Sequence, residues 1–75
     1  MPRFTERRRN KAQRAAVERV VSTATSMTSV VRVEDGSVMV YEDHNDWSPP
    51  AIVRTRITTG GKIEAPDRLY RFNAP

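Results

Sequence analysis

Basic side chains near the N-terminus carry the clearest chemical signal in the sequence. Five of them share one half of a helical cylinder, and these are Arg7, Arg8, Lys11, Arg14 and Arg19. Cations in such a row can follow a nucleic-acid backbone, because each phosphate contact releases condensed counterions. The same row can bind an acidic protein, or it can be a solvated helix face without a ligand. Without base-reading amides beside the arginines, we expect any nucleic-acid binding to be indifferent to sequence.

The net charge of +4 is distributed unevenly along the chain. Residues 1–24 hold seven basic and two acidic groups, whereas residues 25–75 hold six basic and seven acidic groups. The whole excess therefore lies at the N-terminus, as is common for surfaces that bind nucleic acid or acidic proteins. Arg54 and Arg56 share one face of a predicted strand. They would extend the basic surface if that face lies on the same side of the molecule as the basic helix row.

Residues able to support catalysis are scarce. The chain has one histidine and no cysteine, so it lacks the usual combinations of nucleophile and base. His44 lies in a run of Asp and Asn from 43 to 46, but the glycine and distal glutamate of a calcium loop are missing. We therefore predict a solvated turn there. The chain is expected not to be an enzyme and to have no catalytic residue, metal or cofactor.

Trp47 begins a second segment of interest, because it is followed by Ser48 and two prolines. An aromatic ring beside a short polyproline II segment can serve as a recognition surface. The interpretation that we favour is that Trp47 closes the open end of a small core. Met39 and Tyr41 belong to the sheet face away from the predicted helix. Together with Trp47, they form the predicted surface for a protein partner.

Seventy-five residues make one small domain with a thin margin of stability. Chains this short often rely on disulfides, a metal or a partner subunit, and the absence of cysteine favours oligomerisation, with a homodimer as the simplest form. No stretch approaches the roughly 18 apolar residues of a membrane helix, and no signal-peptide run follows the basic start. We expect a cytoplasmic protein without a membrane partner.

The element that positions the basic row is a predicted helix with Thr5 as its N-cap, running from Glu6 to about Ala24. Alanine, valine and Gln13 occupy the half of the cylinder opposite the cations. We expect this half to dock on the domain from Ala12 onward. Accordingly, the chain is divided into two parts. These are a basic helix start, 1–11, that projects or is disordered, and one α+β domain, 12–75.

From residue 30 the apolar period changes from 3.6 to 2. Asp35-Gly36 predicts a two-residue type I′ hairpin, with Val33 opposite Val38 and Val31 opposite Val40. This register gathers the four valines on the face that the helix covers. Gly60-Gly61 predicts a second two-residue turn, in which Thr58 lies opposite Ile63. Residues 42–50, with two prolines, predict a nine-residue connection.

The resulting fold class is α+β, with one N-terminal amphipathic helix packed on a four- to five-stranded antiparallel meander sheet. The last strand is expected to include Phe72. A small chain without catalytic residues and with an arginine-rich start resembles the accessory proteins of phages and mobile elements. We therefore predict a non-enzymatic protein-interaction module that binds a host protein or a second copy of itself. The alternative is a low-specificity nucleic-acid-binding protein that uses the basic helix.

Overall fold

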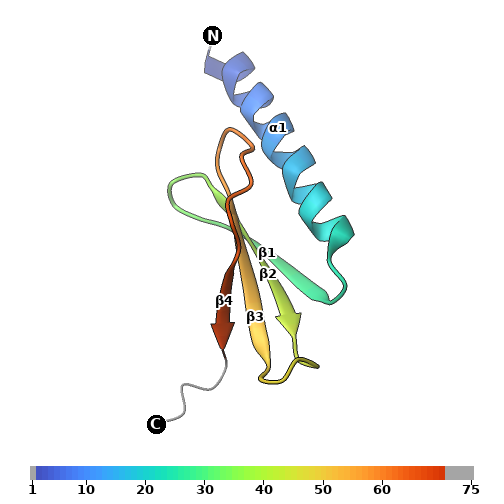
Figure 1. Ribbon diagram of the computed structural model, residues 1–75. Coiled ribbons are helices and arrows are strands. Elements are labelled where there is room, and N and C mark those ends of the chain that lie inside the picture. Colours follow the sequence, from blue (N-terminus) through green and yellow to red (C-terminus); the bar gives the residue numbers. More distant parts are fainter. Residues whose placement is uncertain (1, 71–75) are drawn as a thin grey trace.

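One helix and four strands form the computed structural model, which describes residues 2–70 and the side chains of residues 11–70. In chain order the elements are α1 (Pro2–Thr23), β1 (Met27–Arg32), β2 (Val38–His44), β3 (Ala51–Ile57) and β4 (Asp67–Tyr70). The strands form one antiparallel sheet in the order β1-β2-β3-β4, and α1 packs on one face of it through β2 and β3 (Figure 1). The predicted α+β meander is confirmed, with four strands. Phe72 lies outside the described residues.

Helix α1 begins earlier than predicted and ends within one residue of the expected position. It begins at Pro2, so Thr5 lies inside the helix and the prediction of an N-cap there is wrong. Proline suits a first helical position, where its missing N–H would have no intrahelical partner. At the other end, the Ser22 and Thr23 hydroxyls donate to the Arg19 carbonyl at 3.1 and 3.0 Å. Such side-chain competition for backbone acceptors favours a helix end.

The turn between β1 and β2 differs from the predicted two-residue type. The Val33 N–H donates to the Ser37 carbonyl at 2.9 Å, and the Gly36 N–H donates to the Val33 carbonyl at 3.0 Å, which leaves a three-residue loop. A type I′ turn needs positive φ at both central residues, whereas only Gly36 has one here, at +86°. The geometry is that of a type I turn followed by a glycine bulge. The predicted register is therefore wrong by one residue, and Val30 lies opposite Val40.

The turn between β3 and β4 repeats this geometry. The Thr58 N–H donates to the Lys62 carbonyl and the Gly61 N–H donates to the Thr58 carbonyl, each at 2.9 Å. Gly61 has a φ of +90°, and Gly60 does not adopt a positive φ. Ile57 consequently lies opposite Ile63, in place of the predicted pair of Thr58 with Ile63. In both hairpins a single glycine in the left-handed region carries the turn.

The corrected register changes both faces of the sheet, because a slip of one residue moves the side chains of a strand to the other face. Val30 shares the helix side with Val40, whereas Val31 lies on the opposite face, across from Met39. The predicted face of four valines is therefore wrong. Val38 and Val40 alone among the strand valines are buried.

Strand β2 continues to His44, into the segment that was predicted to be a loop. Its last three residues, 42–44, pair with residues 51–53 of β3. Because β2 has a neighbour on each side, its backbone groups are bonded, and this context outweighs the weak strand propensity of polar residues. The prediction of a nine-residue connection is therefore wrong, and residues 45–50 make the link.

The core is small and lies between α1 and the middle strands. Its buried cluster consists of Ala16, Val38, Val40 and Ile57, and Val40 and Ile57 are its largest fully buried side chains. Half-buried valines of α1 pack against this cluster, and they are Val17, Val20 and Val21.

Gln13 fastens α1 to both hairpin turns. Its side chain is 3% exposed, and its amide Nε2 donates to the Gly36 carbonyl at 2.9 Å and to the Thr58 carbonyl at 3.2 Å. The turn at Gly61 also approaches the helix closely, since a Cβ there would lie 2.9 Å from the backbone of Ala12. Ala12 is thus the first residue with a described side chain that meets the rest of the domain.

Candidate interaction surfaces

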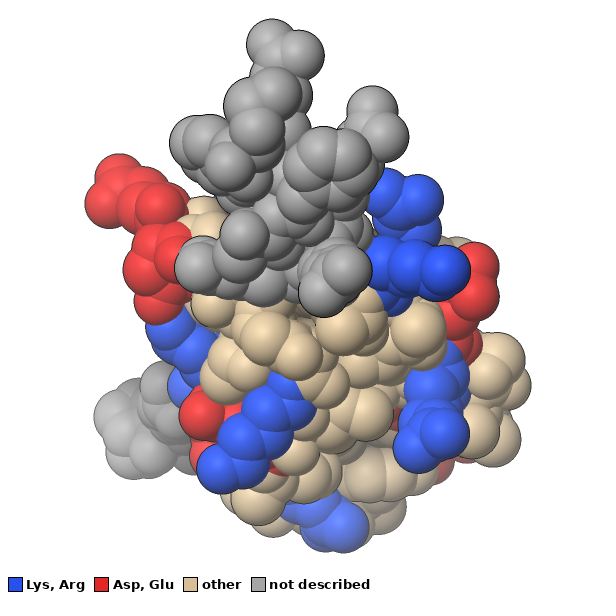
Figure 2. All heavy atoms as spheres, turned by 90° about the horizontal axis from the view of Figure 1, so that it is seen from above, with Lys and Arg blue, Asp and Glu red and all other residues tan. Residues whose placement is uncertain are grey.

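The predicted basic residues do not form one continuous surface. Lys11, Arg14 and Arg19 are exposed on α1, and within residues 11–70 they have no ion pair. The side chains of Arg7 and Arg8 lie outside the described part of the chain. On the face seen in Figure 2, basic side chains lie at several separate places, and acidic side chains lie beside some of them.

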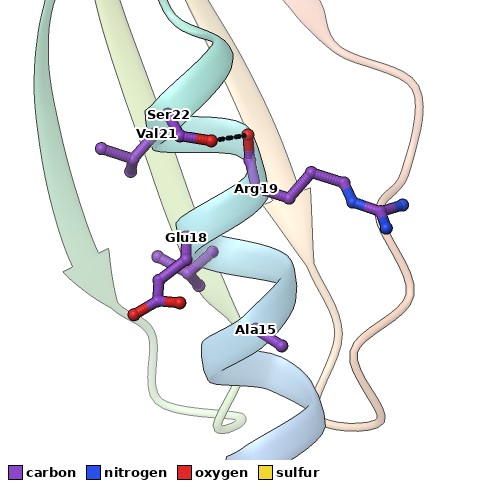
Figure 3. Close-up of a pocket in the computed structure, with 6 residues that line it drawn as sticks. Ala15, Glu18, Arg19, Val21 and Ser22 are labelled. Carbon is purple, nitrogen blue, oxygen red and sulfur yellow. Dashed lines mark hydrogen bonds between the residues drawn. The ribbon is translucent and has the colours of Figure 1, made fainter.

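The exposed half of α1 is also less uniformly basic than its arginines suggest. Glu18 lies one helical turn after Arg14 and directly before Arg19. Figure 3 shows Glu18 and Arg19 leaving the helix in opposite directions, close to Ser22 and its hydrogen bond to the Arg19 carbonyl. An acidic side chain therefore interrupts the described part of the basic row.

Arg54 and Arg56 lie on the sheet face opposite α1, because they alternate with Thr55 and Ile57, which are buried on the helix side. The guanidinium group of each arginine forms an ion pair with an acidic side chain. Arg54 Nη2 lies 3.1 Å from Asp67 Oδ2 of β4. Their face is thus separate from the exposed half of α1, and the condition for a shared basic surface is not met.

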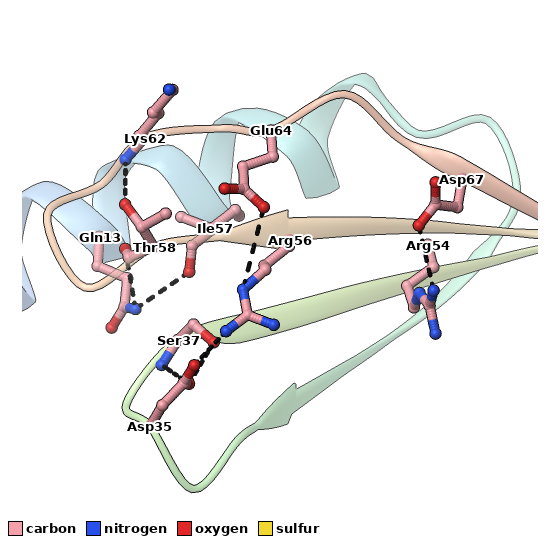
Figure 4. Close-up of polar contacts among 10 residues, drawn as sticks. All are labelled: Gln13, Asp35, Ser37, Arg54, Arg56, Ile57, Thr58, Lys62, Glu64 and Asp67. Carbon is pink, nitrogen blue, oxygen red and sulfur yellow. Dashed lines mark hydrogen bonds and ion pairs between the residues drawn. The ribbon is translucent and has the colours of Figure 1, made fainter.

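Arg56 joins both hairpins through acidic side chains (Figure 4). It contacts Asp35 in the first turn, and its Nε lies 4.0 Å from Glu64 Oε1. Asp35 Oδ1 also accepts hydrogen bonds from the hydroxyl and the N–H of Ser37, at 2.5 and 2.9 Å. The Ser37 hydroxyl, followed by the Ser37 N–H and the Arg56 charge, lowers the pKa of Asp35 below its ordinary value.

The three residues of the predicted protein-binding surface lie on two faces. Met39 and Tyr41 are half-buried on the face away from α1, where they pair with Val31 and Ser29 of β1. Trp47 stacks on His44, with 3.9 Å between ring centroids. His44 and Val40 are an even number of positions apart in β2, so their side chains lie on the same face, which is the helix side. Trp47, which stacks on His44, therefore also lies on the helix side of the sheet.

Trp47 covers the end of the helix side that α1 does not reach. Beneath it His44 is 6% exposed, and the Nε2 atom of His44 lies 3.3 Å from Glu42 Oε1. Above the indole ring the Arg68 guanidinium stands 4.7 Å from the centroid, within the range of a cation–π contact. This placement supports the interpretation of Trp47 as a cover for the core. The predicted solvated turn is confirmed for Asn45 and Asp46, which are exposed, and it is wrong for His44, which ends β2 and is buried beneath the indole ring.

Strand β1 presents an apolar surface that the sequence analysis missed. Met27 is 82% exposed, Val30 51% and Val31 48%. One side of β1 pairs with β2, and no strand within residues 2–70 pairs with its other side. The available signal was the adjacent pair Val30-Val31, since neighbouring side chains in a strand point to opposite faces and α1 covers only one of them.

A groove runs beside this strand, between β1 and α1. Its lining combines three valines and an amide with two guanidinium groups, and the residues are Gln13, Arg14, Val17, Val30, Arg32 and Val38. Val30 therefore belongs both to the groove and to the free edge. Residues 11–70 contain no group of three His, Asp or Glu side chains that could hold a metal ion. In the described part of the chain no helix is long and apolar enough to span a membrane.

No protein-family model, curated protein or solved structure matches the chain. The geometry of residues 2–70 therefore defines the class of the protein: an open four-stranded sheet with a helix on one face and, among those residues, no strand paired with the apolar edge at β1.

Proposed function

We propose that the chain is a small, non-enzymatic protein-interaction module whose partner contacts the apolar edge at β1. The observation that supports this proposal is the contrast between that edge and the core. Met27, Val30 and Val31 are exposed, whereas the buried cluster holds only three side chains larger than alanine. Fully burying a valine or methionine side chain contributes about 1.5–3 kcal/mol. A partner that covers β1 would therefore add to the apolar burial of a small core.

The proposed surface continues from β1 onto the outer face of the sheet. Val31 lies beside Met39, and Ser29 lies beside Tyr41, so the predicted residues of β2 are contiguous with the exposed edge. Trp47 lies on the other face and is assigned to the core. A cytoplasmic location and an accessory role toward a host protein, as in phages and mobile elements, belong to the same proposal.

Affinity capture with the immobilised chain tests this function. We expect specific proteins to be retained from a lysate of the source cell and to be lost with Val31→Asp or Tyr41→Ala. Ile63→Asp is the matched control, because Ile63 is 39% exposed but lies outside β1 and β2. Retention of the same proteins by Val31→Asp, with circular dichroism showing a folded chain, would contradict the proposal.

A second candidate function is sequence-indifferent binding of nucleic acid by α1. It is favoured by Lys11 and Arg14, which are exposed and without an ion pair in the described part of the chain, and by Arg32 on the same side of the sheet. Arg14 and Arg32 line the same groove. The residues of 1–10 would add four arginines and one glutamate along the same helix.

A mobility-shift titration separates this candidate from protein binding. Replacing Arg7, Arg8, Lys11 and Arg14 with Gln should abolish a complex with nucleic acid. The double variant Arg54→Gln, Arg56→Gln, on the far face, should leave the complex intact. A log–log salt slope of roughly −3 to −5 is expected if about four to five phosphates are contacted. Absence of any complex at low salt would eliminate the candidate.

A further inference from the structure

Within residues 2–70, the side of β1 that faces away from β2 has a defined set of backbone groups without a strand partner. In the hairpin Val33 directs its N–H and C=O toward Ser37 and Gly36. Hydrogen-bonded pairs alternate along an antiparallel ladder, so Val31, Ser29 and Met27 also direct their groups toward β2. The N–H and C=O of the intervening residues must point away from β2. These residues are Thr28, Val30 and Arg32, and their six groups form the edge that another strand can bind.

This edge is complementary to a second copy of itself. If two β1 strands run antiparallel about a two-fold axis at Val30, Val30 lies opposite Val30 of the other copy and Thr28 lies opposite Arg32. All the outward groups of both strands then face one another, which gives six hydrogen bonds. A shift by two residues in either direction loses part of this pairing. The strand thus favours one self-pairing register.

Side chains agree with this register. On the helix side the two Val30 side chains, each 51% exposed alone, would meet at the axis. On the outer face Val31 would lie beside Ser29 of the other copy, and Met27 would lie beyond them. The two Arg32 guanidinium groups would be four positions apart along the pair, about 13 Å, which exceeds the Debye length of about 8 Å at physiological salt. The strand charges therefore do not oppose association.

We propose that the partner of β1 is a second copy of this chain, and that the two β1 strands join two sheets into one antiparallel sheet of eight strands. This inference rests on the proposed function and names its partner. A second copy is favoured over an unrelated peptide because the outward hydrogen-bonding groups and apolar side chains of β1 match those of a second copy in one register, and the two arginines of that pair stay apart. Both helices would lie on the same face, and the two grooves would share a floor at Val30.

The small size of the proposed interface predicts that the pairing is weak. One strand of six residues buries less than the roughly 800 Å² per partner of a standard stable interface. The dimer is therefore expected to form reversibly with increasing concentration. Sedimentation equilibrium of the purified full chain, from about 1 µM to about 1 mM, should show the mass rising from 8.5 kDa toward twice that value.

Substitutions at the axis test the geometry. Val30→Lys places two ammonium groups opposite each other and should weaken association at least tenfold, and Val30→Glu should do the same. An equimolar mixture of these two variants should associate again, because only a residue that faces its own copy can be rescued by opposite charge. Leu69→Lys, on the other edge strand, is the control and should associate like the unaltered chain.

Three results would overturn the proposal: a mass that stays at 8.5 kDa throughout, undiminished association of Val30→Lys, or failure of the mixture to associate while both variants remain folded. A monomeric chain that still captures a cellular protein through Val31 and Tyr41 would leave the proposed function standing and reject only the self-pairing. A chain that dimerises through β1 but retains no other protein would leave the self-pairing standing and reject only the role toward a host protein.

Discussion

The two edge strands of the sheet are built differently. Strand β4 has four residues, and it begins with the charged pair Asp67 and Arg68. Asp67 lies 3.1 Å from Arg54, and the Arg68 guanidinium lies over Trp47. Strand β1 has six residues, with a single arginine at its end and apolar side chains on both faces.

Proline, charge and short length are the devices that keep an edge strand from pairing with another chain. Strand β4 has all three, since Pro66 comes directly before it. Strand β1 has none within its central residues. A chain with one protected and one unprotected edge can pair once through a two-fold axis, and the assembly then closes. The difference therefore argues for a defined pair of sheets and against open-ended growth.

The largest expected effect is a difference in stability between proline substitutions on the two sides of β1. Ser29→Pro removes an N–H that bonds to Tyr41 of β2, so the free energy of unfolding should fall by about 1–3 kcal/mol, the cost of leaving a buried acceptor unsatisfied. Thr28→Pro removes an N–H that points to the free edge, and it should cost the monomer much less while weakening self-pairing. Urea denaturation of both variants measures the difference.

Equal losses of stability in these two variants would contradict the assignment of the free backbone groups. A larger loss for Thr28→Pro would place its N–H toward β2, and the proposed axis at Val30 would then be wrong.

The fold could be predicted from the sequence because two periods are plain in it. The apolar spacing of a helix up to about residue 24 and the alternation after residue 30 led to one helix and a meander, which the structure has. What the sequence left open was the turn type. Asp35-Gly36 is compatible with a two-residue turn and with a three-residue loop. They are distinguished by the backbone of Asp35, which does not adopt the positive φ of a type I′ turn, and by the closing bond at Val33.

Because the turn type was ambiguous, the predicted register did not reveal the apolar edge at β1. The predicted register placed Val31 among the core valines, whereas in the structure it lies on the outer face and is 48% exposed. His44 shows the same limit in another form, because a polar residue in a polar run becomes buried only when Trp47 folds over it. Gln13 was correctly placed on the inner half of the helix, but its contacts with Gly36 and Thr58 depend on where both turns end.

A second, smaller effect should follow from removing the protection of β4. The triple variant Pro66→Thr, Asp67→Thr, Arg68→Val gives the chain two unprotected edges. Sheets can then add at both sides, so the weight-average mass should rise above that of the pair and light scattering should grow with concentration.

Adding Val30→Lys to the triple variant provides its control. With β1 blocked and β4 open, growth should stop at a closed pair. A triple variant whose mass remains that of the unaltered chain would show that charge and proline at β4 do not decide which edge pairs.

The smallest effect concerns the acid that ties the end of β1 to the middle of the sheet. Asp35 has a pKa below its ordinary value of 3.8 because of Ser37 and Arg56, so its ionised form is stabilised in the folded chain. The resulting stability is present above the unfolded pKa and is lost as pH falls through the folded pKa. Asp35→Asn should therefore lower the Tm slightly at neutral pH and have no effect at the acid end. Thermal denaturation followed by circular dichroism, with Asp67→Asn as the matched variant at β4, measures this difference. A deficit of Asp35→Asn that grows on acidification would mean that the contacts with Ser37 and Arg56 do not favour the carboxylate.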